Sequence, residues 1–382
     1  MNILFVCHNG IDTNSGNHVA NFAKAVIPSG IDVAVCVPDE YFSDSSISNS
    51  LKVMPWSEAA TFRFSNGQEA DFIHAWTPRQ HVAKITRELA LAHGCNYLVH
   101  LEDNEYVVTS SQLGITQAEL LARSDSIAIP STLADPFDMH DFLRSSAGVT
   151  ALIKSLLEFR PINLPGLEIW PAAEKENFYP TPADPLLRRQ LGLGDHSKVI
   201  VYHGNVHSAN VLEVRSLYLA IAALWRAGVD IFIVRLGKDY VDPLSDAMRE
   251  FEQRIVHVPF QPREKIRHYL ALADLFVQPG RVDEFNIYRF PSKLPEFLAM
   301  GKPVVLPATN VGCSLIHGEN AYLLKSGDGL EIAGAIQSIL SDAALSARLS
   351  SGALRFSEEN LSWASSGGKL ADFYNLAFQR LN

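Results

Sequence analysis

Short apolar strands alternate with amphipathic helices along almost the whole chain, and this alternation starts again near the middle. The strands expected in the first half are residues 2–6, 32–37, 71–75, 97–101 and 126–130. Those expected in the second half are residues 199–203, 230–235, 254–260, 274–278 and 303–307. Continuous apolar runs of this length are typical of parallel strands buried on both faces. The pattern therefore predicts an α/β protein built from two successive doubly wound units.

A segment rich in proline and charge, EIWPAAEKENFYPTPADP, separates the two sets of strands and is typical of a linker. We expect domains at 1–174 and 175–358, because 382 residues exceed what one ordinary core holds. A ligand is expected in the cleft between the two domains. The tail, 359–382, is predicted to be helical. It is either an ordinary terminal helix or one that crosses back to the first domain, bent at Gly367-Gly368.

Composition and charge exclude several classes of protein. The net charge of −10 argues against nonspecific nucleic-acid binding. The four cysteines are far apart and form no C-x-x-C pair, so neither a disulfide framework nor a metal site is expected. The N-terminal run is too short for a signal peptide, and none approaches the ~20 apolar residues of a membrane span. We expect a cytoplasmic protein; a peripheral contact with a membrane is compatible with this sequence.

One segment, RFPSKLPEFLAMGKPVV, combines two cations and one carboxylate around a short predicted helix. Free amides near Ser292 and Lys293 would form an anion site, to which Arg289 and Lys293 add charge. Glu296 lies about one turn further along, where a carboxylate could accept hydrogen bonds from two vicinal hydroxyls. Together these features indicate a nucleotide site. The alternative is a solvated helix face with an i,i+3 ion pair.

The longer segment YRFPSKLPEFLAMGKPVV resembles the donor-binding region of retaining glycosyltransferases with the GT-B fold, of the group 1 or family 4 type. This resemblance implies two Rossmann-like domains that face a central cleft. It also implies that Glu296 holds the donor ribose. The family has another Glu, near the transferred sugar, where this chain has Tyr288.

The segment VYHGNVHSANVLEVRSLYLAIAAL resembles the first strand and loop of the family's second domain. Gly204 matches, but Asn205 stands where the family usually has an arginine that binds the diphosphate. The usual lysine a few residues later is also absent, near Asn210. Either the cations have moved, with Lys238, Arg289 and Lys293 among the candidates, or the chain has kept the fold and lost catalysis.

Segments of the first half resemble the family's acceptor-side domain, in the right order. Gly16, in NSGNHVANF, corresponds to a glycine that lets the backbone approach a ligand. His74, in DFIHAWTP, is expected on the acceptor side. His100, in YLVHLEDNE, corresponds to a residue at the catalytic site, and Glu102 follows it. Structural roles are the alternative for each: backbone geometry for the glycine, packing for the histidines and a solvated loop for the carboxylate.

The resemblance implies hexosyl transfer, with retention, from a nucleotide-diphosphate sugar such as a UDP- or GDP-sugar. The expected acceptor is a glycan, a lipid carrier or a protein, as in cell-surface polysaccharide biosynthesis. No cofactor or metal is expected, since the diphosphate would be held by amides and cations. Two alternatives are a nucleotide-sugar 2-epimerase and a catalytically silent GT-B subunit that supports a partner. The substitutions at Tyr288 and Asn205 motivate the silent subunit.

Overall fold

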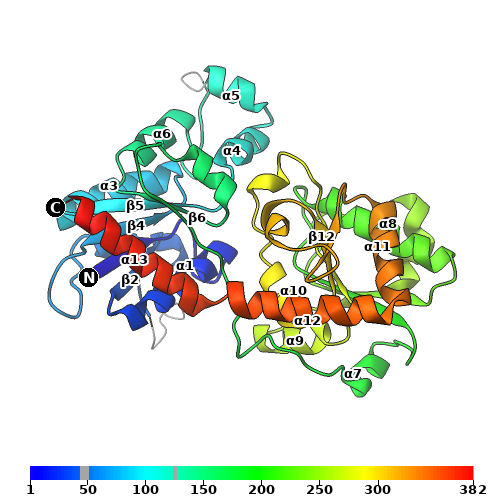
Figure 1. The fold of residues 1–382 in the computed structure, drawn as a ribbon. Coiled ribbons are helices and arrows are strands. Elements are labelled where there is room, and N and C mark those ends of the chain that lie inside the picture. Colours follow the sequence, from blue (N-terminus) through cyan, green and yellow to red (C-terminus); the bar gives the residue numbers. More distant parts are fainter. Residues whose placement is uncertain (44–50, 124–126, 382) are drawn as a thin grey trace. The chain divides into compact units, whose positions relative to one another are not determined.

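The computed structural model describes residues 1–43, 51–123 and 127–381 and divides into two compact units (Figure 1). Unit 1 comprises Met1–Pro171, Tyr288–Phe290 and Trp363–Asn382. Unit 2 comprises Ala172–Ile287 and Pro291–Ser362. The chain passes from unit 1 to unit 2 after Pro171, within the proline-rich linker and close to the boundary expected at residue 174.

Unit 1 is built on a parallel seven-stranded sheet in the order β3-β2-β1-β4-β5-β6-β7. Its strands are β1 (Asn2–Val6), β2 (Asp32–Val37), β3 (Lys52–Pro55), β4 (Phe72–Trp76), β5 (Asn96–Leu101), β6 (Val149–Ala151) and β7 (Gly166–Glu168). The order reverses between β1 and β4. In open α/β sheets, ligands bind beyond the carboxyl ends of the strands at such a switch point.

Helices cover both faces of this sheet. The helices of unit 1 are α1 (Asn14–Val26), α2 (Trp56–Ala59), α3 (Gln80–His93), α4 (Glu105–Leu113), α5 (Gln117–Arg123), α6 (Pro136–Arg144) and α13 (Trp363–Leu381), with 3-10 turns η1 (Ile27–Ser29), η2 (Asp39–Tyr41) and η5 (Lys154–Phe159). The β1–β2 and β4–β5 connections step in opposite directions, so right-handed crossovers place α1 and α3 on opposite faces. Helix α13 packs beside α1 and contributes Leu370, Phe373 and Tyr374 to the core on that face (Figure 1).

Unit 2 repeats this plan with the sheets β10-β9-β8 and β11-β12-β13, which a parallel bridge from Ile200 to Leu275 joins. The strands are β8 (Lys198–His203), β9 (Ile231–Leu236), β10 (Ile255–Val258), β11 (Phe276–Val277), β12 (Val304–Pro307) and β13 (Tyr322–Leu324). The helices are α7 (Pro185–Gln190), α8 (Val211–Arg226), α9 (Arg263–Leu270), α10 (Leu294–Ala299), α11 (Gly329–Ser341) and α12 (Ala343–Asn360), with 3-10 segments η6 (Asp246–Arg254), η7 (Asn286–Tyr288) and η8 (Asn310–Ser314). Its switch point lies between β8 and β11.

Nine of the ten predicted strands occur, but the one expected at 126–130 does not. Residues 127–130 are irregular, and residue 126 lies outside the described residues. The sequence analysis also missed β3, β6, β7 and β13, each of three or four residues. Such short strands are fixed by neighbouring strands rather than by a periodic pattern of their own.

The double glycine in the tail does not bend the helix in the way that one of the two alternatives supposed, because α13 runs unbroken from Trp363 to Leu381. A Cβ on Gly367 would lie 2.1 Å from the carbonyl oxygen of Ala25 in α1. A Cβ on Gly368 would meet nothing within 4 Å. Gly367 therefore permits close packing of the two helices.

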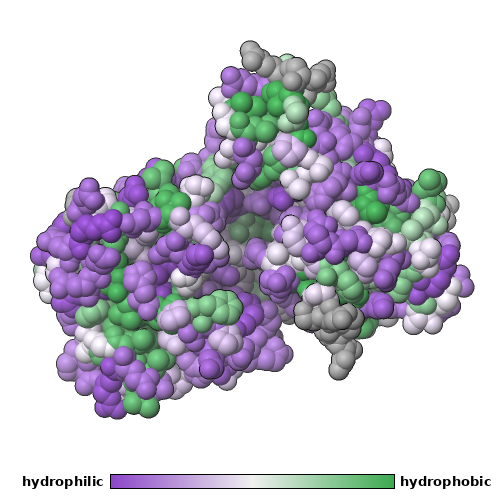
Figure 2. Space-filling view, turned by 180° about the vertical axis from the view of Figure 1, so that it is seen from behind, coloured by the Kyte–Doolittle hydropathy of each residue, from purple (hydrophilic) through white to green (hydrophobic). Residues whose placement is uncertain are grey.

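None of the described helices is both long enough and apolar enough to cross a bilayer. Figure 2 shows one face of the molecule, on which hydrophilic residues surround separate hydrophobic patches.

The packing of α1 on α13 predicts opposite effects for two neighbouring substitutions. Gly367→Ala should lower the free energy of unfolding by about 1–3 kcal/mol, because an overpacked interface must shift apart. Gly368→Ala should raise it by up to about 1 kcal/mol, since alanine favours the helix more than glycine does. Urea unfolding followed by circular dichroism measures both, and equal effects would contradict the proposed packing.

Candidate functional site

In unit 2, two glycine loops meet at the carboxyl ends of β8 and β9. Gly204 and Gly237 have φ angles of 121° and 114°, a region that favours glycine. A Cβ on Gly237 would lie 2.5 Å from the carbonyl oxygen of Gly204, so the two loops touch through their backbones. The side chain of Asn205 joins them further, since its Oδ1 accepts a hydrogen bond from the Lys238 amide at 3.0 Å.

Glu296 is the buried carboxylate of this region, with 2% of its surface exposed. Its Oε1 lies 3.0 Å from Nη2 of Arg263, and its Oε2 lies 2.6 Å from Nε2 of His203. The contact with His203 lacks hydrogen-bond geometry. Burial would raise the pKa of Glu296, but the contact with His203 and the charges of Lys293 and Arg263 outweigh burial and lower it to about 2. Glu296 is therefore ionised at neutral pH.

Arg263 divides its guanidinium between two carboxylates. Besides Glu296, it binds both oxygens of Glu174, with Nη2 to Oε2 at 2.5 Å, and it stacks over Phe178 at 5.0 Å. His203 is buried at the end of β8, and burial lowers its pKa despite the nearby Glu296. Neither His203 nor Arg263 was predicted from the sequence, since no pattern links residues 203, 263 and 296.

The helix predicted after Ser292 is shorter than the anion-site argument requires. Helix α10 has six residues, begins at Leu294 and has Lys293 at its N-cap with no side-chain hydrogen bond. A dipole of this length adds little, so the charge at this point comes from Lys293 itself. Its Cε lies 3.8 Å from where a Cβ on Gly204 would stand. The structure thus brings Gly204, Lys293 and Glu296 together.

Three other predicted donor residues lie elsewhere or make other contacts. Tyr288 and Arg289 belong to unit 1, and their expected place beside the donor stays a prediction. Tyr288 donates a hydrogen bond to Glu158 at 3.1 Å and packs against Phe159. Lys238 is exposed, and its ammonium lies over the ring of Tyr240 at 4.8 Å.

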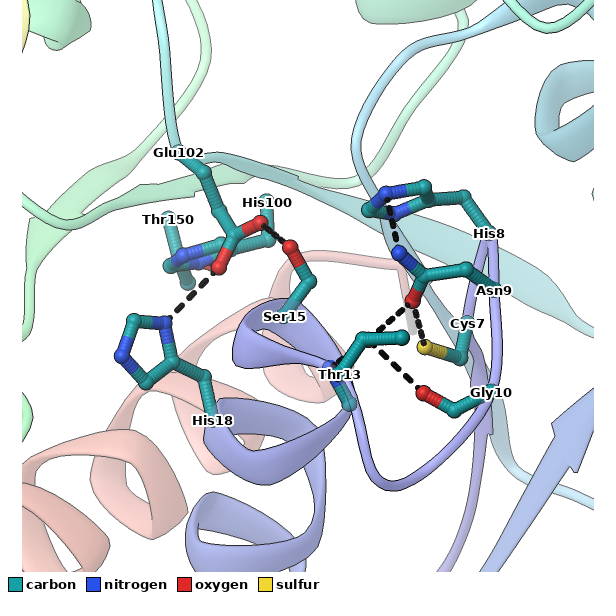
Figure 3. A network of polar contacts seen from close by, with 11 residues as sticks. Cys7, His8, Asn9, Gly10, Thr13, Ser15, His18, His100, Glu102 and Thr150 are labelled. Carbon is teal, nitrogen blue, oxygen red and sulfur yellow. Dashed lines mark hydrogen bonds and ion pairs between the residues drawn. The ribbon is translucent and has the colours of Figure 1, made fainter. Parts of the chain in front are cut away.

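In unit 1, the loop between β1 and α1 is held by its own side chains (Figure 3). Thr13 caps α1 by accepting from the Gly16 amide, and its Oγ1 lies 2.6 Å from Oδ1 of Asn9. A Cβ on Gly16 would lie 2.2 Å from the carbonyl oxygen of Gly10. The close backbone approach expected at Gly16 is therefore to the protein's own loop rather than to a ligand.

Glu102 follows β5 and is buried, not part of a solvated loop. Its Oε1 lies 2.9 Å from Nδ1 of His18, and its Oε2 accepts a hydrogen bond from Ser15 (Figure 3). Burial would raise the pKa of Glu102, but the hydrogen bond and charge of His18 reverse this effect and lower it well below its usual range. Neither His18 nor Ser15 was predicted from the sequence, although α1 carries both on the face that meets Glu102.

Alternation along the strands places His74 and His100 on the sheet face that α13 covers. His74 is completely buried, with Nδ1 2.7 Å from the Tyr374 hydroxyl and Nε2 3.1 Å from Oγ1 of Thr150. It is a core residue here, which corrects its expected place on an acceptor surface. His100 is also buried; its ring stacks on Trp76 at 3.7 Å, and its Nδ1 lies 2.7 Å from Oγ1 of Thr150.

Eight buried side-chain atoms lack a hydrogen-bond partner in the described part of unit 1, and three of them lie at the ends of three adjacent strands. These three are Nδ1 of His8 after β1, Oγ1 of Thr77 after β4 and Nε2 of His100 on β5. Thr77 also has a φ of 76°, a strained value for a β-branched residue. Unsatisfied polar atoms and backbone strain cluster at functional sites. The switch point of unit 1 is therefore a candidate polar ligand site.

Among the described residues, acidic, histidine and cysteine side chains do not gather into a metal site in either unit. No group of three or more of them that could hold a metal ion occurs within residues 1–43, 51–123 and 127–381.

Two Rossmann-like parallel-sheet domains of this kind define the GT-B fold. Comparison with solved structures agrees. The chain resembles Anabaena HepE in complex with UDP-glucose, with a TM-score of 0.69 and 17% identity over 98% of this chain and 99% of that one. It also resembles sucrose-phosphate synthase from Thermosynechococcus elongatus, with a TM-score of 0.66 and 16% identity over the whole of both chains.

Sequence comparison matches unit 2 to a known family. Residues 197–342 match the family described as glycosyl transferases group 1. The chain is 26% identical over 193 residues to alpha-D-kanosaminyltransferase of Streptomyces kanamyceticus, covering 49% of this chain. The match spans 48%, about half, of that relative's length.

The ionised state of Glu296 predicts a defined pH dependence. Its pKa falls from 4.5 to about 2 on folding, so its charge stabilises the protein above about pH 4.5. That contribution is lost as the pH falls toward 2. Glu296→Gln should cost about 3 kcal/mol at pH 7, the scale for breaking a buried pair. The difference from wild type should shrink below pH 4.5 in thermal unfolding.

The matched control is Glu250→Gln, which removes a carboxylate from an exposed ion pair with Arg226 in the same unit. It should change stability by less than about 1 kcal/mol. If the stability lost in Glu296→Gln stays constant from pH 7 to pH 3, the charge of Glu296 is not the source of that stability.

Proposed function

We propose that the chain is a glycosyltransferase that transfers a sugar, with retention, from a nucleotide-diphosphate sugar to a glycan, a lipid-linked acceptor or a protein. The observation that carries the proposal is the ionised, buried Glu296 beside Gly204 and Lys293, within the segment that matches group 1 glycosyl transferases. A carboxylate suits the two ribose hydroxyls. A cation beside a loop with a positive-φ glycine suits a diphosphate.

In this proposal, Oε2 of Glu296 accepts a ribose hydroxyl in place of its non-linear contact with His203. Lys293 and the amides near Gly204 neutralise the diphosphate as it leaves, so the reaction needs no metal ion. The unpartnered atoms of His8, Thr77 and His100 in unit 1 bind hydroxyls of the sugar or acceptor. Polar groups that are already fixed in position stabilise the charge that develops in the transition state, and this lowers the activation barrier of the transfer.

The likeness to a structure with UDP-glucose and the match to a kanosaminyltransferase support the class of donor. A match of 46% identity over 55 residues to the putative teichuronic acid biosynthesis glycosyltransferase TuaH of Bacillus subtilis supports a role in cell-surface polysaccharide synthesis. That match covers 14% of each chain. We place the reaction in the cytoplasm, where nucleotide sugars are the substrates.

Donor binding is the first test. A thermal-shift panel of UDP, GDP, ADP, TDP and the matching nucleotide sugars should show one base that stabilises the chain. A ligand at a hundredfold excess over Kd adds about 2.7 kcal/mol. If no nucleotide shifts the melting temperature, the proposal fails. Nucleotide binding without transfer of the sugar to any acceptor would favour a silent subunit. Conversion of the donor sugar in the absence of an acceptor would favour an epimerase.

Glu296→Gln should then weaken binding of that nucleoside diphosphate by about 1.5–3 kcal/mol, since it removes a charged hydrogen-bond acceptor from the ribose. Calorimetry on folded protein at pH 7 measures the loss. The control Glu250→Gln removes a carboxylate from the exposed ion pair with Arg226 and should leave the nucleotide affinity unchanged. Equal affinity for wild type and Glu296→Gln would contradict the ribose contact.

His100→Gln should reduce kcat far more than it weakens donor binding, because His100 is proposed to contact the transferred sugar or acceptor and not the nucleotide. Steady-state kinetics and calorimetry on the same preparation separate the two effects. Equal losses in kcat and affinity, or none, would place His100 outside the reacting centre.

A further inference from the structure

A continuous chain of contacts runs from the C-terminal helix to His100 in the interior of unit 1. The Tyr374 hydroxyl lies 2.7 Å from Nδ1 of His74, and Nε2 of His74 lies 3.1 Å from Oγ1 of Thr150. The same Oγ1 lies 2.7 Å from Nδ1 of His100. The register of the sheet builds this chain, because His100 on β5 pairs with Thr150 on β6.

Hydrogen bonding along this chain can run in two senses. In the forward sense, Tyr374 donates to His74, His74 donates to Thr150, and Thr150 donates to Nδ1 of His100. In the reverse sense, every donor becomes an acceptor, and the hydroxyl proton of Tyr374 is left without an acceptor. The forward sense leaves one buried group without a partner among the described residues, the Nε2–H of His100. The reverse sense leaves two, the hydroxyl proton of the completely buried Tyr374 and the bare Nε2 of His100, so the forward sense is favoured.

Both imidazoles must be neutral for this argument, and their surroundings make them so. Burial lowers the pKa of His74 to about 3 and lowers that of His100 well below its ordinary value. The rings of Phe5 and Trp76 pack around His74, and Trp76 stacks on His100 at an interplanar angle of 17°. The acidic group that acts on His100 is Glu102, whose carboxylate is already bound by His18 and Ser15.

We infer that Tyr374 is a positioning residue that acts through His74 and Thr150 to fix the tautomer of His100. In the forward sense, Nδ1 of His100 accepts and its single proton lies on Nε2. That atom is buried and has no partner among the described residues. His100 therefore presents an N–H donor, and its ligand must supply an acceptor oxygen.

The catalytic meaning of this donor rests on the proposed function. An imidazole whose Nε2 already carries a proton cannot remove one from an acceptor hydroxyl through that atom. It can donate a hydrogen bond to a hydroxyl, ring or phosphate oxygen. In a glycosyltransferase, His100 would then orient an oxygen of the sugar and would not act as a base.

Tautomers are read directly by long-range ¹H–¹⁵N spectra of the full-length protein, with histidine labelled and no nucleotide added. His74→Gln and His100→Gln assign the two rings. We expect His100 to show a protonated Nε2 and an unprotonated Nδ1, and His74 to show the same. A protonated Nδ1 on His100 in the wild-type protein would by itself overturn the inference.

Tyr374→Phe tests whether Tyr374 sets the tautomer of His100 without touching it. It removes one oxygen that does not touch His100, yet it should turn the single tautomer of His100 into a mixture, because neither sense then strands a tyrosine proton. Thr150→Val, which cuts the chain, should do the same. The matched control is Tyr97→Phe, since Tyr97 is also buried in unit 1 and donates to the carbonyl of Phe142 at 2.9 Å.

Tyr97→Phe should leave the His100 spectrum unchanged. An unchanged spectrum in Tyr374→Phe, or an equal change in Tyr97→Phe, would overturn the inference. The spectra need no substrate, so they decide the tautomer even if the nucleotide panel shows that the proposed function is wrong.

Discussion

Both units depend on one constraint: a parallel sheet that is covered on both faces can accommodate polar chemistry mainly where its strands end. The central strands β1, β4, β5 and β8 are buried almost throughout. Their carboxyl ends are where the chain leaves the sheet and backbone amides become free to bind something else. The candidate sites of the two units accordingly lie at equivalent points, beside the reversal of strand order in each sheet.

Burying charge at those ends requires partners that fix both position and ionisation. In unit 2, Arg263 and His203 keep Glu296 ionised, and in unit 1 His18 does this for Glu102. An isolated carboxylate at such burial would instead take up a proton. The same requirement gives the neutral His100 its fixed hydrogen-bond sense, since each buried donor needs an acceptor.

Much of the architecture could be predicted from sequence because the long buried strands carry their own signal. The segments at β1, β2, β4, β5, β8 and β9 were identified by their continuous apolar runs. Glu296 and Lys293 were identified from one local segment, and the structure brings them to the Gly204 loop. The prediction was wrong for His74, which is in the core because its surroundings come from distant parts of the chain. The donor-site roles of Tyr288 and Arg289, which belong to unit 1, stay predictions.

The sequence by itself determined the two α/β units, the alternation that turns His74 and His100 to the same face, and the presence of Glu296 and Lys293 within one short segment. These are properties of period and local composition. Only the tertiary structure decided which groups meet: Arg263 with Glu296, His18 with Glu102, and Tyr374 with His74, 300 residues apart. No short pattern encodes such pairs, because strand order and helix packing, rather than sequence spacing, set the distances between them.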